Sequence, residues 1–182
     1  MKRLRELKRL PETAIYAEMN TPIGQLTIIT TEDKLHAILW ENERHNSACE
    51  DIIKSFRKQE NQEIVLKVKE QLNEYFQGKR KTFNIPLALN GTHFQMLVWK
   101  QLQKIPYGKT ISYGEQAKLL GDKNKARAVG LANGLNPISI IVPCHRVIGT
   151  NGKLVGFGGG LDIKSFLLAF EKEVGVSNET IF

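Results

Sequence analysis

Residues 112–137 read SYGEQAKLLGDKNKARAVGLANGLNP and carry the start and stop signals of two helices. Ser112 followed by Glu115 forms a capping box, which predicts a helix that begins here and ends at Gly121. A second helix is predicted over residues 125–135, because the residue before a proline avoids helical backbone angles. Two helices joined by a short turn that contains a glycine favour a helix-turn-helix.

The second predicted helix carries small residues on one face, since Ala126, Gly130 and Gly134 recur at every fourth position. Small side chains allow a helix backbone to approach another surface closely. Two interpretations remain open at this point. The face packs tightly against another helix, which is the commoner use of such a stripe, or it approaches nucleic acid in a narrow groove with Arg127 as the projecting cation.

The flanking segments complete a mainly helical second half. Apolar side chains at helical spacing predict a helix over residues 94–104, which ends before Pro106. The β-branched run 138–142 is expected to be buried, and the glycine-rich residues 149–160 are expected to form a loop. A final amphipathic helix is predicted over residues 162–173.

The first half mixes strands and helices. Three short runs rich in Ile and Thr, separated by turn sequences, predict a three-stranded meander. Two segments with helical spacing and one extended segment follow. The strands are residues 14–19, 25–30 and 35–40, the helices are 48–56 and 65–76, and the extended segment is 79–86.

The turn pair Asn90-Gly91 marks the boundary between the two halves. The predicted fold class is α+β, with a small α/β domain over residues 1–90 and a mainly helical domain with a helix-turn-helix over residues 91–182. A chain of 182 residues is long enough for two small domains with cores of their own.

Composition excludes several classes of protein. A hydrophobic content of 41% and a charged content of 25% exclude collagen-like and disordered chains. No apolar run approaches the roughly 18 residues of a membrane span, so no membrane partner is expected. The basic start has no apolar signal segment and the chain has only two cysteines, so we expect a cytoplasmic protein with free thiols.

The net charge of +7 is concentrated in the second half. Residues 93–182 hold eleven basic and six acidic side chains. This imbalance favours a polyanionic partner, although a solvated lysine surface without a partner fits equally well.

The clearest chemical signal is the pair Cys144-His145. A thiol is a strong nucleophile only as the thiolate, and an imidazole can take its proton directly or through a water. Neighbours on a strand point to opposite sides, so the pair can cooperate only if the chain turns here, and the preceding Pro143 favours such a turn. A third group must orient the imidazole. The candidates are Glu171, Glu173 and Asp162.

Three other interpretations of this pair are possible. A buried structural thiol is the commoner fate of a single cysteine. A Cys-His hydrolase needs the same three groups. A metal site is disfavoured because the remaining ligand types show no paired spacing. Those residues are Cys49, His36, His45 and His93.

The motifs in residues 94–171 resemble the O6-alkylguanine-DNA alkyltransferases, also called methylated-DNA–protein-cysteine methyltransferases. The matching pieces are Val98-Trp99, Ile105-Pro106-Tyr107-Gly108, Ser112-Tyr113, Ala126-Arg127-Ala128-Val129-Gly130, Asn136-Pro137, Val142-Pro143-Cys144-His145-Arg146-Val147, Gly159-Gly160-Leu161, and Lys164, Leu167-Leu168 and Glu171. The first half is more loosely similar to the family's ribonuclease-H-like domain, mainly through Thr21-Pro22-Ile23-Gly24.

The resemblance implies a set of catalytic roles. Cys144 would take the alkyl group from O6 of a damaged guanine, His145 would act as a base through a water, and Glu171 would orient His145. Asn136 would brace the turn that carries the cysteine. Tyr113 would rotate the 3′ phosphate and help to protonate the leaving guanine.

The resemblance also implies how DNA would bind. The small-residue helix would enter the minor groove, and Arg127 would fill the gap left when the nucleotide flips out of the stack. The implied DNA-binding residues are Arg127, Tyr113, Ala126, Gly130, Lys125 and Ala128. The implied substrate pocket comprises Phe157, Gly158, Val147, Trp99 and Pro143.

The implied function is DNA repair on O6-alkylguanine, and by the same chemistry on O4-alkylthymine. Each molecule would act in a single turnover, because the thioether product is stable. The expected partner is double-stranded DNA, and no cofactor or metal is expected. We expect a monomer, and cooperative rows along DNA stay open. The alternative is a non-catalytic sensor of alkylation damage, which the presence of Cys144 disfavours. A transcriptional regulator would need additional segments that 182 residues do not accommodate.

Two departures from the family pattern concern specificity and metal. Many relatives have a tyrosine, and often a serine, in the pocket loop, where this chain has Phe157 and Gly158. Phe157 can stack on a base but has no hydroxyl, and Gly158 offers only its backbone N–H. We expect a wider pocket that admits larger alkyl groups. The first 48 residues contain no cysteine, so the zinc site of some relatives is not expected.

Overall fold

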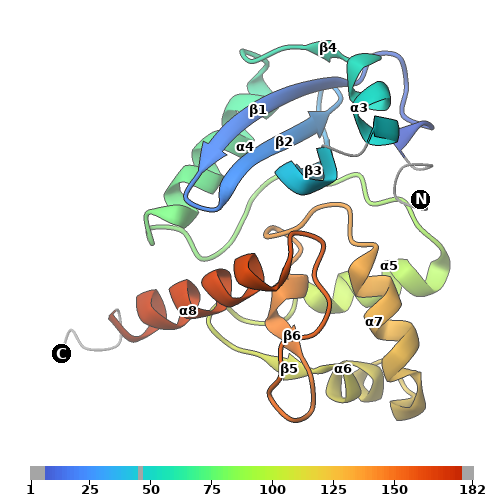
Figure 1. Cartoon of the computed structure of the whole chain (residues 1–182), viewed down its shortest axis with the longest axis vertical. Helices are drawn as coiled ribbons and strands as arrows, with labels where there is room; N and C mark the ends of the chain where they lie inside the picture. Colours follow the sequence, from blue (N-terminus) through green and yellow to red (C-terminus); the bar gives the residue numbers. More distant parts are fainter. Residues whose placement is uncertain (1–6, 45–46, 178–182) are drawn as a thin grey trace. The chain divides into compact units, whose positions relative to one another are not determined.

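The computed structural model describes residues 7–44 and 47–177. The chain divides into two compact units, Met1–Asn90 and Gly91–Phe182 (Figure 1). The first unit contains a sheet with helices and the second is mainly helical, which confirms the predicted α+β fold class.

The first unit is built on a four-stranded sheet in the order β3-β2-β1-β4. Strands β1 (Ile15–Thr21), β2 (Gly24–Thr30) and β3 (Leu35–Trp40) form the predicted antiparallel meander. Strand β4 (Arg57–Lys58) adds a short parallel edge beside β1. The sequence did not reveal β4, because two exposed basic residues show no hydrophobic alternation.

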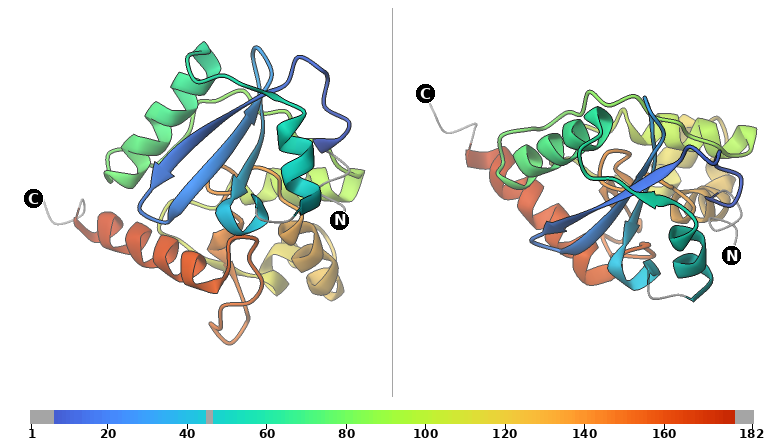
Figure 2. Two further views of the ribbon diagram at one scale, coloured as in Figure 1. Left: turned by 45° about the horizontal axis from the view of Figure 1, so that its top comes forward. Right: turned by 90° about the horizontal axis from the view of Figure 1, so that it is seen from above.

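Helices cover both faces of this sheet. They are α2 (Glu41–Arg44), α3 (Ser47–Lys54) and α4 (Glu63–Phe76). Successive strand residues face opposite sides, so the face that includes Ile29 packs on α3 and the face that includes Ala17 packs on Val65 of α4. Figure 2 shows the two helices on either side of the sheet. The segment expected to be extended, residues 79–86, has no regular secondary structure, and α2 was not predicted.

The second unit contains five helices or helical turns around a short strand pair and ends in a long helix. Its elements are α5 (His93–Leu102), β5 (Ile111–Ser112), α6 (Tyr113–Leu119), η1 (Lys123–Lys125), α7 (Ala126–Gly134), η2 (Cys144–Arg146), β6 (Val147–Ile148) and α8 (Leu161–Ser177). Strands β5 and β6 pair in parallel. The predicted helices are present, and α8 extends beyond the predicted residues 162–173.

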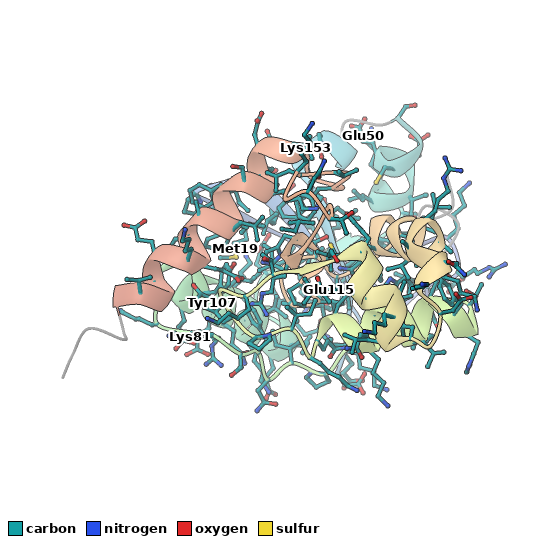
Figure 3. The ribbon with its side chains drawn as sticks, turned by 90° about the horizontal axis from the view of Figure 1, so that it is seen from below. Met19, Glu50, Lys81, Tyr107, Glu115 and Lys153 are labelled. Atoms are coloured by element: carbon teal, nitrogen blue, oxygen red, sulfur yellow. The ribbon has the colours of Figure 1, made fainter. Side chains whose placement is uncertain are left out.

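Capping explains where two of these helices begin. Thr92 and Gln95 form a capping box at α5, and Ser112 and Glu115 form the predicted one at α6. Figure 3 labels Glu115, which lies on α6. In each box the hydroxyl accepts the third backbone N–H while the longer side chain accepts the N–H of the cap residue. Both helices therefore have fixed first turns.

Buried polar contacts join α5, α6 and α7. The indole N–H of Trp99 donates to the carbonyl of Ala132 at 2.9 Å. Nε2 of Gln116 donates to the carbonyl of Val98, and its Oε1 accepts from Nδ2 of Asn133. Trp99 is thus a core residue between helices rather than part of a pocket wall.

In the described part of the chain, no helix is both long and apolar enough to cross a membrane.

Candidate active site

The segment that leads from α7 to the cysteine is a buried series of tight turns. Nδ2 of Asn136 donates to the carbonyl of Val142 at 2.7 Å, and its Oδ1 accepts from the backbone N–H of Ile138 at 3.1 Å. Asn136 therefore ties together the two ends of the β-branched run, which is buried as predicted. Ile140 within the run adopts φ +72°, an angle that a β-branched residue rarely takes without such support.

Cys144 opens the 3₁₀ turn η2 directly after Pro143. Its backbone N–H donates to the carbonyl of Val142 at 2.9 Å, and the N–H of Arg146 donates to the carbonyl of Pro143 at 3.1 Å. The chain therefore turns at Cys144 and His145, as cooperation between the two side chains requires. Cys144 is buried but keeps some contact with the surface, at 6% exposure.

The carboxylate that orients His145 is Glu171. Nε2 of His145 donates to Oε1 of Glu171 at 2.8 Å, and both residues are fully buried. The other two candidates, Glu173 and Asp162, are exposed on α8. The structure thus selects one of the three carboxylates that the sequence left open.

The second ring nitrogen of His145 defines its chemistry. Nδ1 is buried and has no hydrogen-bond partner among the described residues. Because Glu171 accepts the proton of Nε2, Nδ1 is the unprotonated nitrogen of the neutral ring. Burial lowers the pKa of His145, and Glu171 only partly opposes that effect. His145 therefore rests as a neutral base with one available acceptor.

Glu171 accepts hydrogen bonds from other groups besides the imidazole. Nε and Nη2 of Arg146 donate to its two oxygens at 2.9 Å each, and the backbone N–H of Gly108 donates at 3.0 Å. A Cβ on residue 108 would lie 3.0 Å from the Glu171 carbonyl, so the approach requires glycine. Burial raises the pKa of Glu171, but His145 and Arg146 together outweigh it and lower the pKa to about 2.

Lys164 is a further buried charge near the site, and its role was not predicted from the sequence. Its Nζ donates to the carbonyls of Val147 and Val155 at 2.7 and 2.9 Å and lies 3.4 Å from the hydroxyl of Tyr113. Burial lowers the pKa of Lys164 to about 8, although Cys144 acts in the opposite direction. Lys164 and Glu171 lie on the same buried face of α8. This helical spacing is the signal in the sequence that could have identified Lys164 as a buried residue.

A groove of about 510 Å³ lies beside these residues. It is bounded by α7 on one side and by the glycine-rich loop on the other. Its lining consists of Tyr113, Ala126, Arg127, Gly130, Leu131, Gly134, Val155, Gly156, Phe157 and Gly158. The small-residue face of α7 therefore borders an open groove.

Phe157 lines the groove and also contacts the buried group formed by Cys144, His145 and Glu171. Its ring packs edge-on against the ring of His145, with centroids 6.5 Å apart. Burial, and to a lesser degree Cys144, raise the pKa of Tyr113 to about 12, which keeps its hydroxyl protonated. The groove thus lies close to the buried thiol, because Tyr113 lines the groove and interacts electrostatically with Cys144.

The other predicted residues lie at the edge of this groove or outside it. Lys125 and Ala128 are exposed on η1 and α7, and Arg127 is exposed at the groove edge. Pro143 and Val147 flank the cysteine turn and are buried. Of the candidate metal ligands, His45 lies outside the described residues. Within residues 7–44 and 47–177, no three His, Cys, Asp or Glu side chains gather where they could hold a metal ion.

Comparison with known proteins identifies both halves of the chain. Residues 14–89 match the family model "6-O-methylguanine DNA methyltransferase, ribonuclease-like domain", and residues 93–173 match the "DNA binding domain" of the same protein. A Methanosarcina acetivorans protein named methylated-DNA–protein-cysteine methyltransferase is 46% identical over 156 residues, which span 86% of this chain and 97% of that protein.

Solved structures give the same result. The O6-methylguanine methyltransferase of Mycobacterium tuberculosis is 43% identical, and the match covers 88% of this chain and 93% of that one with a TM-score of 0.77. The same organism's OGT in complex with DNA is 44% identical over 87% of this chain and 93% of that one, also with a TM-score of 0.77. A relative aligned over nearly its whole length, together with two matched domains, places this chain in the methylated-DNA–protein-cysteine methyltransferase family.

Proposed function

We propose that this chain repairs DNA by moving the alkyl group of O6-alkylguanine to Sγ of its own Cys144. The bond between O6 and the alkyl carbon breaks as the bond between that carbon and Sγ forms. The thiol proton passes through a water to Nδ1 of His145. The guanine takes up a proton as it leaves, with Tyr113 as its donor, and the product is an S-alkylcysteine.

One observation carries this proposal. The buried Nδ1 of His145 has no partner among the described residues, while Nε2 is fixed by Glu171 next to the cysteine turn. A base held in this way is suited to take a thiol proton through one water. A thioether is chemically stable, so each molecule would act once. The same displacement applies to O4-alkylthymine.

DNA is the partner that the groove supports. The target carbon is hidden inside a duplex, so the nucleotide must leave the stack to reach Cys144. The proposed arrangement uses α6, η1 and α7 as a helix-turn-helix whose small-residue face approaches the minor groove. Arg127 at the groove edge would occupy the vacated position in the stack, and Tyr113, Lys125 and Ala128 would contact the backbone. The protein would act as a cytoplasmic monomer, alone or in rows along DNA.

Intact mass spectrometry tests the proposal. Incubation with a duplex that carries O6-methylguanine should add one methylene unit to the chain, and Cys144→Ser should show no gain. Tight binding to the damaged duplex without a mass change would indicate a non-catalytic sensor instead. Clearance of many lesions by one molecule would indicate a hydrolase.

A further inference from the structure

Arg146 is a buried arginine next to the proposed base, and each of its three guanidinium nitrogens donates a hydrogen bond. Nε and Nη2 bind the two oxygens of Glu171, and Nη1 donates to the carbonyl of Ile105 at 2.6 Å. The guanidinium carbon lies 5.6 Å from the centre of the Tyr107 ring. Arg146 itself is only 6% exposed. A buried charge of this kind is costly unless it is paired, so its position calls for a reason.

The arrangement saturates the carboxylate. Oε1 of Glu171 accepts from His145 and Arg146, and Oε2 accepts from Arg146 and the backbone N–H of Gly108. Four donors occupy the sites that a carboxylate offers in its plane. The bidentate contact also fixes the plane of the carboxylate, since an arginine fork matches its geometry.

We propose that Arg146 is a positioning residue that neutralises Glu171 and thereby keeps His145 a neutral imidazole with its proton on Nε2. This inference rests on the proposed function only for the use of Nδ1, which would accept the proton of Cys144. Without the guanidinium, His145 would be the main group that could place a positive charge beside the Glu171 carboxylate. The pKa of the His145 ring would then rise, since Arg146 no longer opposes Glu171. A larger fraction of the rings would hold a second proton on Nδ1 and could not accept one.

The other charged and titratable groups around the ring act in known directions. Glu171 on α8 raises the pKa of His145, whereas Arg146 on η2 and Lys164 on α8 lower it. Cys144 adjoins the ring in the chain, and Tyr107 lies against Arg146 and Glu171. Arg146 is the group among these that contacts the Glu171 carboxylate directly and carries a permanent positive charge.

Nitrogen NMR of ring-labelled histidine in the full chain, without DNA, tests the inference. His145 is assigned by the loss of its signals in His145→Gln. The wild-type ring should be protonated on Nε2 alone at neutral pH, and a doubly protonated ring would overturn the proposal even if no variant folds. In Arg146→Gln the titration midpoint of His145 should rise by about one pH unit or more. In Arg146→Lys, which keeps the charge, it should stay closer to wild type.

The pH profile of alkyl transfer separates positioning from simple loss of structure. Arg146→Gln should transfer slowly at neutral pH and regain rate as the pH rises past the new midpoint of His145, because the ring then loses its extra proton. A rate that is lowered equally at every pH, with an unchanged midpoint in folded protein, would overturn the proposal. The NMR result does not depend on transfer, so a chain that never gains mass would refute the proposed function alone.

Discussion

The hydroxyl of Tyr113 donates a hydrogen bond of 2.9 Å to the carbonyl of Val155, and Nζ of Lys164 donates to the same oxygen at 2.9 Å. Tyr113 begins α6, Lys164 lies on α8, and Val155 belongs to the loop that borders the groove. The loop is therefore held at one carbonyl from two helices. A nucleotide that needs the Tyr113 hydroxyl must first break one of these bonds, while Lys164 keeps the other.

Tyr113→Phe should loosen the loop without unfolding the unit. Loss of one hydrogen bond, worth about 1 kcal/mol, should make amide exchange over residues 149–160 several-fold faster. Hydrogen exchange with mass spectrometry measures this change. Tyr16→Phe in β1 is the matched control. Unchanged exchange in the loop would mean that Lys164 alone holds it.

Glu171→Gln should change how stability depends on acid. Burial raises the pKa of Glu171, but His145 and Arg146 lower it to about 2, below the ordinary value of 4.5. Between these values the unfolded chain binds a proton that the folded chain does not, so folded stability decreases as the pH falls from 4.5 towards 2. Urea unfolding across this range should show a shallower loss in Glu171→Gln than in wild type.

This variant should also be less stable at neutral pH by about 3–5 kcal/mol, because Arg146 is left buried without its carboxylate. Glu173→Gln, an exposed change on the same helix, is the control and should behave as wild type. Equal acid slopes in wild type and Glu171→Gln would contradict the assigned pairing.

Arg127→Ala should separate base extrusion from the chemical step. Arg127 is exposed, so its removal should change the free energy of unfolding by less than about 0.5 kcal/mol. Transfer from a duplex should slow at least tenfold if this side chain fills the vacated stack. Transfer from the free O6-benzylguanine base, which requires no extrusion, should keep its rate. An unchanged rate on duplex DNA would exclude the role.

The sequence predicted those features that depend on local signals. The capping box at Ser112, the turn at Pro143 and the adjacent Cys144-His145 pair are short-range patterns, and the fold placed them as expected. Arg146 and Lys164 were not assigned, because charged side chains are normally solvated and only tertiary packing shows that these two are buried. The choice of Glu171 over Glu173 likewise depended on which face of α8 is covered.

The width of the groove gives a prediction about substrate range. Gly158 lines the groove and does not adopt a positive φ, so a side chain at this position is not strained by a left-handed backbone. Wild-type protein should transfer a benzyl group from duplex DNA at least as fast as a methyl group. Gly158→Val adds bulk to the groove wall and should slow benzyl transfer by about tenfold or more while methyl transfer changes little.

Rapid-quench rates on the two adducts measure this difference, with Lys153→Ala, an exposed change in the same loop, as the control. A wild-type protein with a strong preference for methyl groups would show that the absence of a side chain at Gly158 does not widen the site.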